Sequence, residues 1–181
     1  MVIRLPEAGY REDPQLVQFF SQALERVRQL PTVRSAGMVN FLPLYGGLGS
    51  NTGFKILGQP EPPPGQGPST DVRVADSGYF SSLGIPLLRG RNFSDSEQRE
   101  AKHVILINEA LARKHSPNQD PIGQRLDVAM FEKPTPAEII GIVGNVRYDS
   151  LIDEAPPAVY FPHPDLAYPF MTLVVRTDGE P

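Results

Sequence analysis

The sequence predicts an α+β fold, and three observations lead to this prediction. Helical and extended patterns do not alternate strictly along the 181 residues, as they would in a doubly wound sheet. About nine short apolar or alternating segments outnumber three helical ones. The chain also holds 16 glycines and 20 prolines, an unusually large share, so we expect many turns.

The first forty residues predict a β-α-β unit. Asp13 followed by Pro14 is typical of a helix start, with Asp13 as N-cap and Pro14 in the first turn. Pro31 ends this helix after Leu30, because proline cannot continue the hydrogen-bond ladder. The apolar positions of one helix face are Leu16, Val17, Phe20, Leu24 and Val27. The flanking strands are expected at Val2–Leu5 and Val33–Phe41.

The rest of the chain predicts short strands separated by turns and two short helices. One helix is expected over Ser77–Leu83, ended by Gly84, and the other over Glu109–His115, capped by Asn108. The fully apolar run Val104–Ile107 is typical of a central strand. The other expected strands are Phe54–Leu57, Asp71–Ala75 (alternating and therefore half-buried), Pro86–Leu88, Gln124–Val128, Ile139–Val143, Ala158–Phe161 and Met171–Val175.

Two segments are expected to be loops. Gly46–Asn51 is rich in glycine, and Gln59–Pro68 holds five prolines, which favours an extended excursion on the surface. The uncharged stretch Ser35–Phe54 has the length of a membrane span, but its glycines and Pro43 exclude a lipid-exposed helix. We therefore expect no direct membrane insertion by this chain.

Composition excludes several classes of function. The chain has no cysteine, so disulfide frameworks, thiolate zinc sites and cysteine nucleophiles are excluded. A net charge of −4 is unsuited to binding a phosphate backbone, so nucleic acid is not an expected partner. The first residues lack the basic and apolar regions of a signal peptide.

Glycine-rich and carboxylate-rich segments suggest sites but fit ordinary structure better. Gly141–Gly144 matches no nucleotide-binding motif and predicts a strand followed by a turn, and Gly46–Gly49 lacks the lysine of a phosphate loop. Three groups of charged residues could form a metal site or an acid–base site: a charged turn, two residues six positions apart on one helix, and the carboxylates of a surface turn. A solvated surface is favoured for each group. These residues are Asp95, Glu97, Glu100 and His103; Glu109 and His115; and Asp149, Asp153 and Glu154.

Aromatic residues offer one more alternative. Tyr79, Phe80 and Phe93 could form an exposed patch for an apolar ligand, but burial beneath the short helix is favoured. No catalytic, cofactor-binding or metal-binding residue is assigned, no cofactor is expected, and the chain is not expected to be an enzyme. The chain stops soon after Asp178, a natural N-cap, so we expect a fragment truncated at the C-terminus.

Four segments together resemble the MacB-like periplasmic core domain of ABC-transporter permeases, especially permeases with an FtsX-like membrane part. The segments are Asp76–Phe93, Val104–Arg113, Asp120–Leu126 and Glu138–Arg147. Their order and spacing follow that family's pattern over nearly the whole chain. The family has no ATPase motif in this domain, and this chain has none.

The resemblance implies a fold of two lobes and a location outside the cytoplasm. A β-α-β, porter-like lobe would use 1–50 and 150–181, and a mostly β lobe would be inserted over 51–149. The family places this domain between the first two transmembrane helices, on the periplasmic side of the inner membrane. Its implied partners are those helices, the ATPase subunit or domain of the parent transporter, and a periplasmic adaptor protein.

The resemblance implies a non-catalytic domain that contacts an adaptor or substrate and couples its movement to the membrane helices during export or mechanotransmission. The alternative is a stand-alone soluble ligand-binding module, with a cleft formed by the β lobe and the Gly46–Gly53 loop. For contact with a partner, the proline-rich stretch and the turn Arg89–Phe93 are the candidate surfaces.

Overall fold

The fold is mixed α+β, as the sequence predicts. The computed structural model describes residues 1–6, 9–10, 13–44, 49–63, 65–148 and 152–178. Within this part the elements are β1 (Val2–Arg4), α1 (Asp13–Arg28), β2 (Val33–Val39), β3 (Ser50–Ile56), β4 (Ser69–Val74), α2 (Ser77–Leu83), β5 (Leu87–Gly90), β6 (Val104–Asn108), α3 (Glu109–His115), β7 (Arg125–Val128), β8 (Ala137–Val143), β9 (Ala158–Phe161) and β10 (Phe170–Thr177).

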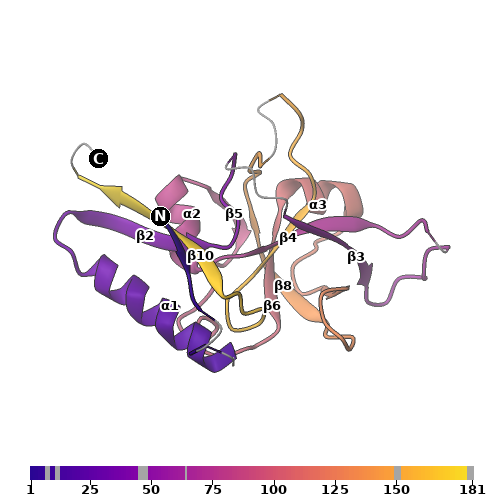
Figure 1. Ribbon diagram of the computed structural model, residues 1–181. Coiled ribbons are helices and arrows are strands. Elements are labelled where there is room, and N and C mark those ends of the chain that lie inside the picture. The colour runs from indigo at the N-terminus through magenta and orange to yellow at the C-terminus, as the bar shows by residue number, and fades with distance from the viewer. Residues whose placement is uncertain (7–8, 11–12, 45–48, 64, 149–151, 179–181) are drawn as a thin grey trace.

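A three-stranded antiparallel sheet, in the order β1-β10-β2, joins the two ends of the described chain. Helix α1 covers one face of this sheet, and α2 lies on the other (Figure 1). The side chains of α1 that are buried in this way are Leu16, Phe20 and Leu24. They belong to the same apolar cluster as Ala36, Met38, Met171 and Leu173 of the sheet, as the alternation of strand residues requires.

Two glycines allow α2 to rest its first turn directly on β2. A Cβ atom at Gly37 would lie 2.1 Å from the backbone nitrogen of Tyr79, and one at Gly78 would lie 2.2 Å from the carbonyl oxygen of Ala36. Neither position has room for a side chain, so the two backbones approach as only glycine permits. Gly84, at φ 70°, ends α2 as expected.

The second sheet has seven strands in the order β5-β8-β6-β9-β4-β3-β7, and pairing of β7 with β8 closes it on itself. Strands β8, β6, β9, β4, β3 and β7 therefore form a barrel, and β5 adds to the outside of β8. One buried cluster includes Val72, Val74, Ile105, Ile107, Val159 and Phe161. The alternate residues Leu106, Ala158 and Tyr160 join a second cluster with Tyr79 and Phe80 of α2. Helix α2 is thus packed between the barrel and the three-stranded sheet.

Strand β6 is a central strand, as its apolar run predicts. All five of its residues are buried, and it pairs in parallel with β8 and antiparallel with β9. The side chain of Asn108 then caps α3, because its Oδ1 accepts a hydrogen bond of 2.9 Å from the backbone nitrogen of Leu111. The predicted helix Glu109–His115 has these same bounds.

Strand β9 lies in the barrel, whereas the expected division assigned 150–181 to the β-α-β lobe. It pairs in parallel with β4 and antiparallel with β6, and its four residues are all buried. An apolar four-residue strand needs neighbours on both sides, and local pattern does not say which strands those are. The lobe boundaries themselves, 1–50 with 150–181 and 51–149, stay a prediction.

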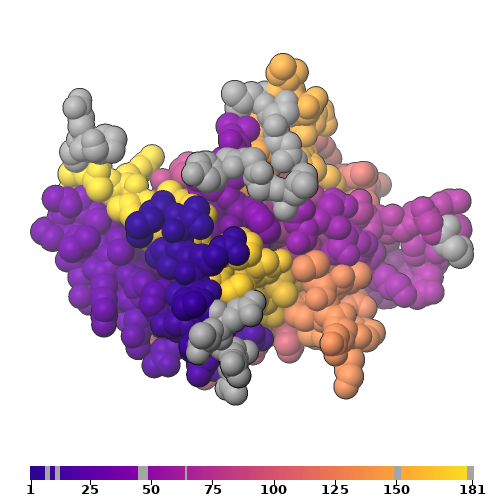
Figure 2. Space-filling model, in the orientation of Figure 1, coloured from indigo at the N-terminus to yellow at the C-terminus, as the bar shows by residue number. Residues whose placement is uncertain are grey.

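The described ends of the chain lie at one end of the molecule, in the three-stranded sheet. The segment that leads from β3 to β4 projects at the opposite end (Figure 2). That segment contains the proline-rich stretch, whose described residues 59–63 and 65–67 are exposed, as expected. Among the described helices, none combines the length and the apolar character that crossing a bilayer requires.

Candidate functional site

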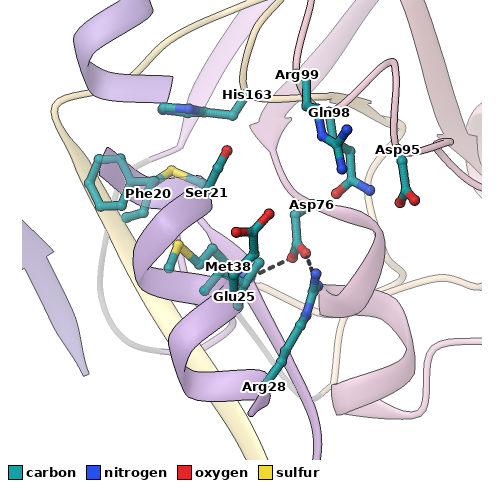
Figure 3. Close-up of a pocket in the computed structure, with 12 residues that line it drawn as sticks. Phe20, Ser21, Glu25, Arg28, Met38, Asp76, Asp95, Gln98, Arg99 and His163 are labelled. Atoms are coloured by element: carbon teal, nitrogen blue, oxygen red, sulfur yellow. Dashed lines mark hydrogen bonds and ion pairs between the residues drawn. The ribbon is translucent and has the colours of Figure 1, made fainter. Parts of the chain in front are cut away.

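A cleft lies where α1, the end of β2, the start of α2 and a turn at residues 95–99 meet (Figure 3). Its enclosed part has a volume of about 80 Å³, room for a few water molecules. The lining residues come from segments far apart in the sequence. They are Phe20, Ser21, Leu24, Glu25, Arg28, Met38, Asp76, Asp95, Gln98, Arg99, His163 and Met171.

Asp76 is the central polar group of this cleft. Its carboxylate caps α2 by accepting hydrogen bonds of 3.1 Å each from the backbone nitrogens of Gly78 and Tyr79. It also accepts 2.6 Å and 2.5 Å hydrogen bonds from the backbone nitrogen of Met38 and from Nη2 of Arg28. Asp76 itself follows β4, so one buried side chain joins the barrel to α1, β2 and α2.

Asn40 makes a second connection between the two sheets. Its backbone nitrogen donates to the carbonyl of Val74 at 2.9 Å, and its side-chain Oδ1 accepts from the nitrogen of Val74 at 3.0 Å. Val39 also forms an isolated antiparallel bridge with Ala75. The predicted strand Val33–Phe41 therefore ends at Val39, because Asn40 turns its hydrogen bonds toward the barrel.

Burial dominates the electrostatics of the cleft. Burial raises the pKa of Asp76, and the Met38 N–H and the Arg28 guanidinium act in the opposite direction. Burial also lowers the pKa of His163. The Nε2 of His163 lies 3.1 Å from both the backbone nitrogen and the carbonyl oxygen of Tyr168, and the tautomer of the ring decides which of the two it bonds.

The polar groups of the cleft are used mainly in hydrogen bonds that hold α1, β2 and α2 together. The Asp76 oxygens are already occupied by four donors, so this carboxylate is poorly placed to take a proton from a substrate. The Nε2 of His163 is occupied as well. Nowhere in the described ranges do three histidine or carboxylate side chains gather in a way that could hold a metal ion.

The predicted acidic turn does not converge on one point. Glu97 is buried and accepts 2.7 and 2.8 Å hydrogen bonds from Arg91, together with two from Ser94. Glu100 pairs with Lys102 instead. The fourth residue, His103, lies 3.8 Å from the buried carboxylate of Asp165, while Asp95 lines the cleft.

The other predicted candidates are also dispersed. Glu109 accepts a 3.0 Å hydrogen bond from Asn145, whereas His115 packs its ring edge against Phe54. Residues 141–143 form the end of β8, as predicted, and Gly144 follows the strand. Asp149 and residues 46–48 of the glycine-rich loop lie outside the described residues. The aromatic residues that were expected to be buried, Tyr79, Phe80 and Phe93, are at most 5% exposed.

Sequence alternation missed a second buried polar cluster, around Arg73. A half-buried strand would expose Arg73, but its side chain is 1% exposed and pairs with Asp71 at 3.0 Å. The guanidinium carbon lies 4.1 Å from the centre of the Tyr148 ring. A Cβ at Gly49 would lie 1.9 Å from Nη1, so the backbone at Gly49 covers the charge. Only the fold brings these segments together.

Sequence comparison identifies a family that matches nearly the whole chain and a relative that matches part of it. A family model described as the MacB-like periplasmic core domain matches residues 4–180. The macrolide export ATP-binding/permease protein MacB of Mannheimia succiniciproducens is 32% identical over 77 residues. That match covers 42% of this chain and 11% of the relative, so the chain corresponds to a small part of that protein.

Solved structures share the fold. The periplasmic region of MacB from Actinobacillus actinomycetemcomitans matches with a TM-score of 0.60 at 12% identity, over 99% of this chain and 75% of that one. The extracellular domain of the ABC-type transporter YknZ from Gram-positive bacteria matches with a TM-score of 0.57 at 14% identity, over 87% and 72%. At such identities the likeness concerns the fold.

Proposed function

Since this chain belongs to the MacB-like periplasmic core domain family, we propose that it works as the non-catalytic extracytoplasmic core of an ABC-type export permease. The observation that carries the proposal is the family match, which runs over residues 4–180. The MacB relative is named as an ATP-binding and permease protein, so the parent of this chain would supply the ATPase and the membrane helices.

The arrangement of the sheets supports a role in coupling. Strands β1 and β10 are neighbours, so membrane segments attached at the two ends would pull on one small sheet. Movement of that sheet reaches the barrel through α2 and through the hydrogen bonds of Asp76 and Asn40. The barrel, with its projecting β3–β4 segment, would then present the surface that meets an adaptor protein.

The first test concerns location and uses the full-length parent protein in intact cells. The 181 residues hold no cysteine, so single replacements such as Gln22→Cys and Pro62→Cys add one thiol each within the domain. Parent cysteines outside the domain are replaced beforehand. A membrane-impermeant maleimide is expected to label both exposed positions before lysis. Labelling only after lysis would refute an extracytoplasmic domain.

The second test concerns coupling. Asp76→Ala in the full-length protein removes the connection between α1, β2 and α2, so ATP hydrolysis is expected to continue while export falls at least tenfold. Glu132→Ala, which changes an exposed carboxylate on a turn outside the cleft, is the control. Equal loss of ATP hydrolysis and export in the Asp76 variant, at normal abundance, would contradict transmission through this junction.

A further inference from the structure

A longer groove continues the cleft along the outward face of α1. It has a volume of about 510 Å³ and shares Ser21, Glu25 and Arg99 with the cleft. We call it the α1 groove. Its other lining residues include Asp13, Pro14, Val17, Glu100, Ala101 and Pro164. The volume is in the range of small-molecule sites.

Most of the exposed surface of the α1 groove is apolar, and polar side chains stand between its apolar residues. Pro14 and Val17 line the helix side, and Ala101 and Pro164 line the opposite side. Asp13, Val17, Ser21 and Glu25 follow one another at intervals of four residues, so they form one stripe along α1. A carboxylate therefore stands at each end of a stripe that is about 18 Å long, with Val17 and Ser21 between the two.

The unpaired charges around this groove are mainly negative. Asp13, Glu25 and Asp95 have no ion pair in the described part of the chain, and Arg99 is the one lining cation there that also has none. Glu100 is neutralised by Lys102, and Asp76 by Arg28. Glu25 and Asp95 stand on opposite sides of the cleft where it meets the groove (Figure 3).

We propose that the α1 groove binds a small amphiphilic organic cation, an ammonium group carried on a short aliphatic chain. The chain lies against Pro14, Val17, Ala101 and Pro164, which removes apolar surface from water on both partners. The ammonium group meets the carboxylate of Glu25, within the field of Asp95. An aliphatic carboxylate of the same length is rejected, because the unpaired Asp13 and Glu25 line the groove, Asp95 lies in the adjoining cleft, and only Arg99 attracts it.

The test uses octylammonium and octanoate at submicellar concentrations with the 181-residue chain, followed by amide chemical shifts and by calorimetry. Octylammonium is expected to bind at least tenfold more tightly than octanoate, with shifts centred on Val17 and Ala101. The double variant Glu25→Gln/Asp95→Asn is expected to lose at least tenfold in affinity. Both side chains are exposed, so the remaining amide spectrum is expected to stay unchanged. Glu132→Gln, on a distant exposed turn, is the matched control.

Three results with octylammonium and octanoate would overturn the inference. They are equal affinity for octylammonium and octanoate, unchanged affinity in the double variant, and shifts located away from α1. Binding of an amphipathic lysine–leucine peptide without binding of octylammonium would also overturn it, since the groove would then serve a polypeptide. None of these outcomes bears on the role in an export permease, which is tested in the full-length protein.

Discussion

Replacement of Asp76 by alanine tests whether one carboxylate holds the two sheets together. The variant removes the acceptor for the backbone nitrogens of Met38, Gly78 and Tyr79 and for the guanidinium of Arg28. Nothing else in the described cleft is positioned to replace all four hydrogen bonds. We therefore expect a large loss of stability and no change in the exposed surface.

The size of the loss follows from the environment of each donor. Loss of an N-cap costs about 1 kcal/mol. Leaving the buried nitrogen of Met38 without an acceptor costs about 1–3 kcal/mol. The Arg28 side chain is 39% exposed, so water replaces its partner and the lost pair adds under about 1 kcal/mol. The sum is about 3 kcal/mol, equivalent to a fall in Tm of about 6–12 °C for a chain of this size.

Urea unfolding of the wild type and three variants measures this loss. Asp76→Asn keeps one acceptor oxygen and is expected to lose less than Asp76→Ala. Asp95→Ala changes an exposed carboxylate in the same cleft and is expected to stay within about 0.5 kcal/mol of the wild type. A free energy of unfolding for Asp76→Ala within about 0.5 kcal/mol of the wild type would show that the four hydrogen bonds are replaceable and refute the reasoning.

Three further predictions concern packing and pH. Gly37→Ala places a Cβ 2.1 Å from the backbone nitrogen of Tyr79 and is expected to lose about 3 kcal/mol or more in urea unfolding, whereas normal stability would mean that α2 shifts freely. Hydrogen bonds from Arg91 lower the pKa of Glu97 from 4.5 to about 2. The contribution of the Glu97 carboxylate to the free energy of unfolding is therefore complete above pH 4.5 and is lost as the pH falls toward 2. Because Arg91 is half-exposed, Glu97→Gln is expected to lower the free energy of unfolding by only about 1–2 kcal/mol at pH 7 and by little at pH 2. An equal loss of stability at both pH values would contradict the pairing of Glu97 with Arg91. Burial lowers the pKa of His163 below 6.5, so the unfolded chain takes up the proton first and stability falls as the pH drops below 6.5. An NMR titration of the His163 ring with a midpoint at or above 6.5 would exclude this.

The local sequence pattern predicted the position of most helices and strands, but it did not predict which strands pair with one another. The helix Ser77–Leu83 and the strand Ala158–Phe161 have their predicted bounds because capping residues and apolar runs mark them. The same patterns say nothing of the closure between β7 and β8 or of the place of β9, because strand pairing depends on contacts far apart in the sequence.

The cleft illustrates the same limit at the level of single residues. Asp76 before a short helix carries a recognisable N-cap signal, so its role toward Gly78 and Tyr79 could have been found from sequence. Its bonds to Met38 and Arg28 could not, since those residues lie some forty positions earlier. The burial of Arg73 contradicts its alternating pattern for a similar reason, because α2 and a distant loop cover that face of the sheet.

The neighbouring positions of β1 and β10 have a consequence for the order of folding. Val2 pairs with Thr172, about 170 residues later, so the three-stranded sheet has one of the most distant pairings that the chain allows. During synthesis the strands of the barrel emerge before β10 does. The apolar faces of α1 and β2 therefore remain exposed until β10 has been synthesised and can pair with β2. Ribosome-stalled chains that end before residue 170 should be more sensitive to proteases over residues 13–39 than over the barrel.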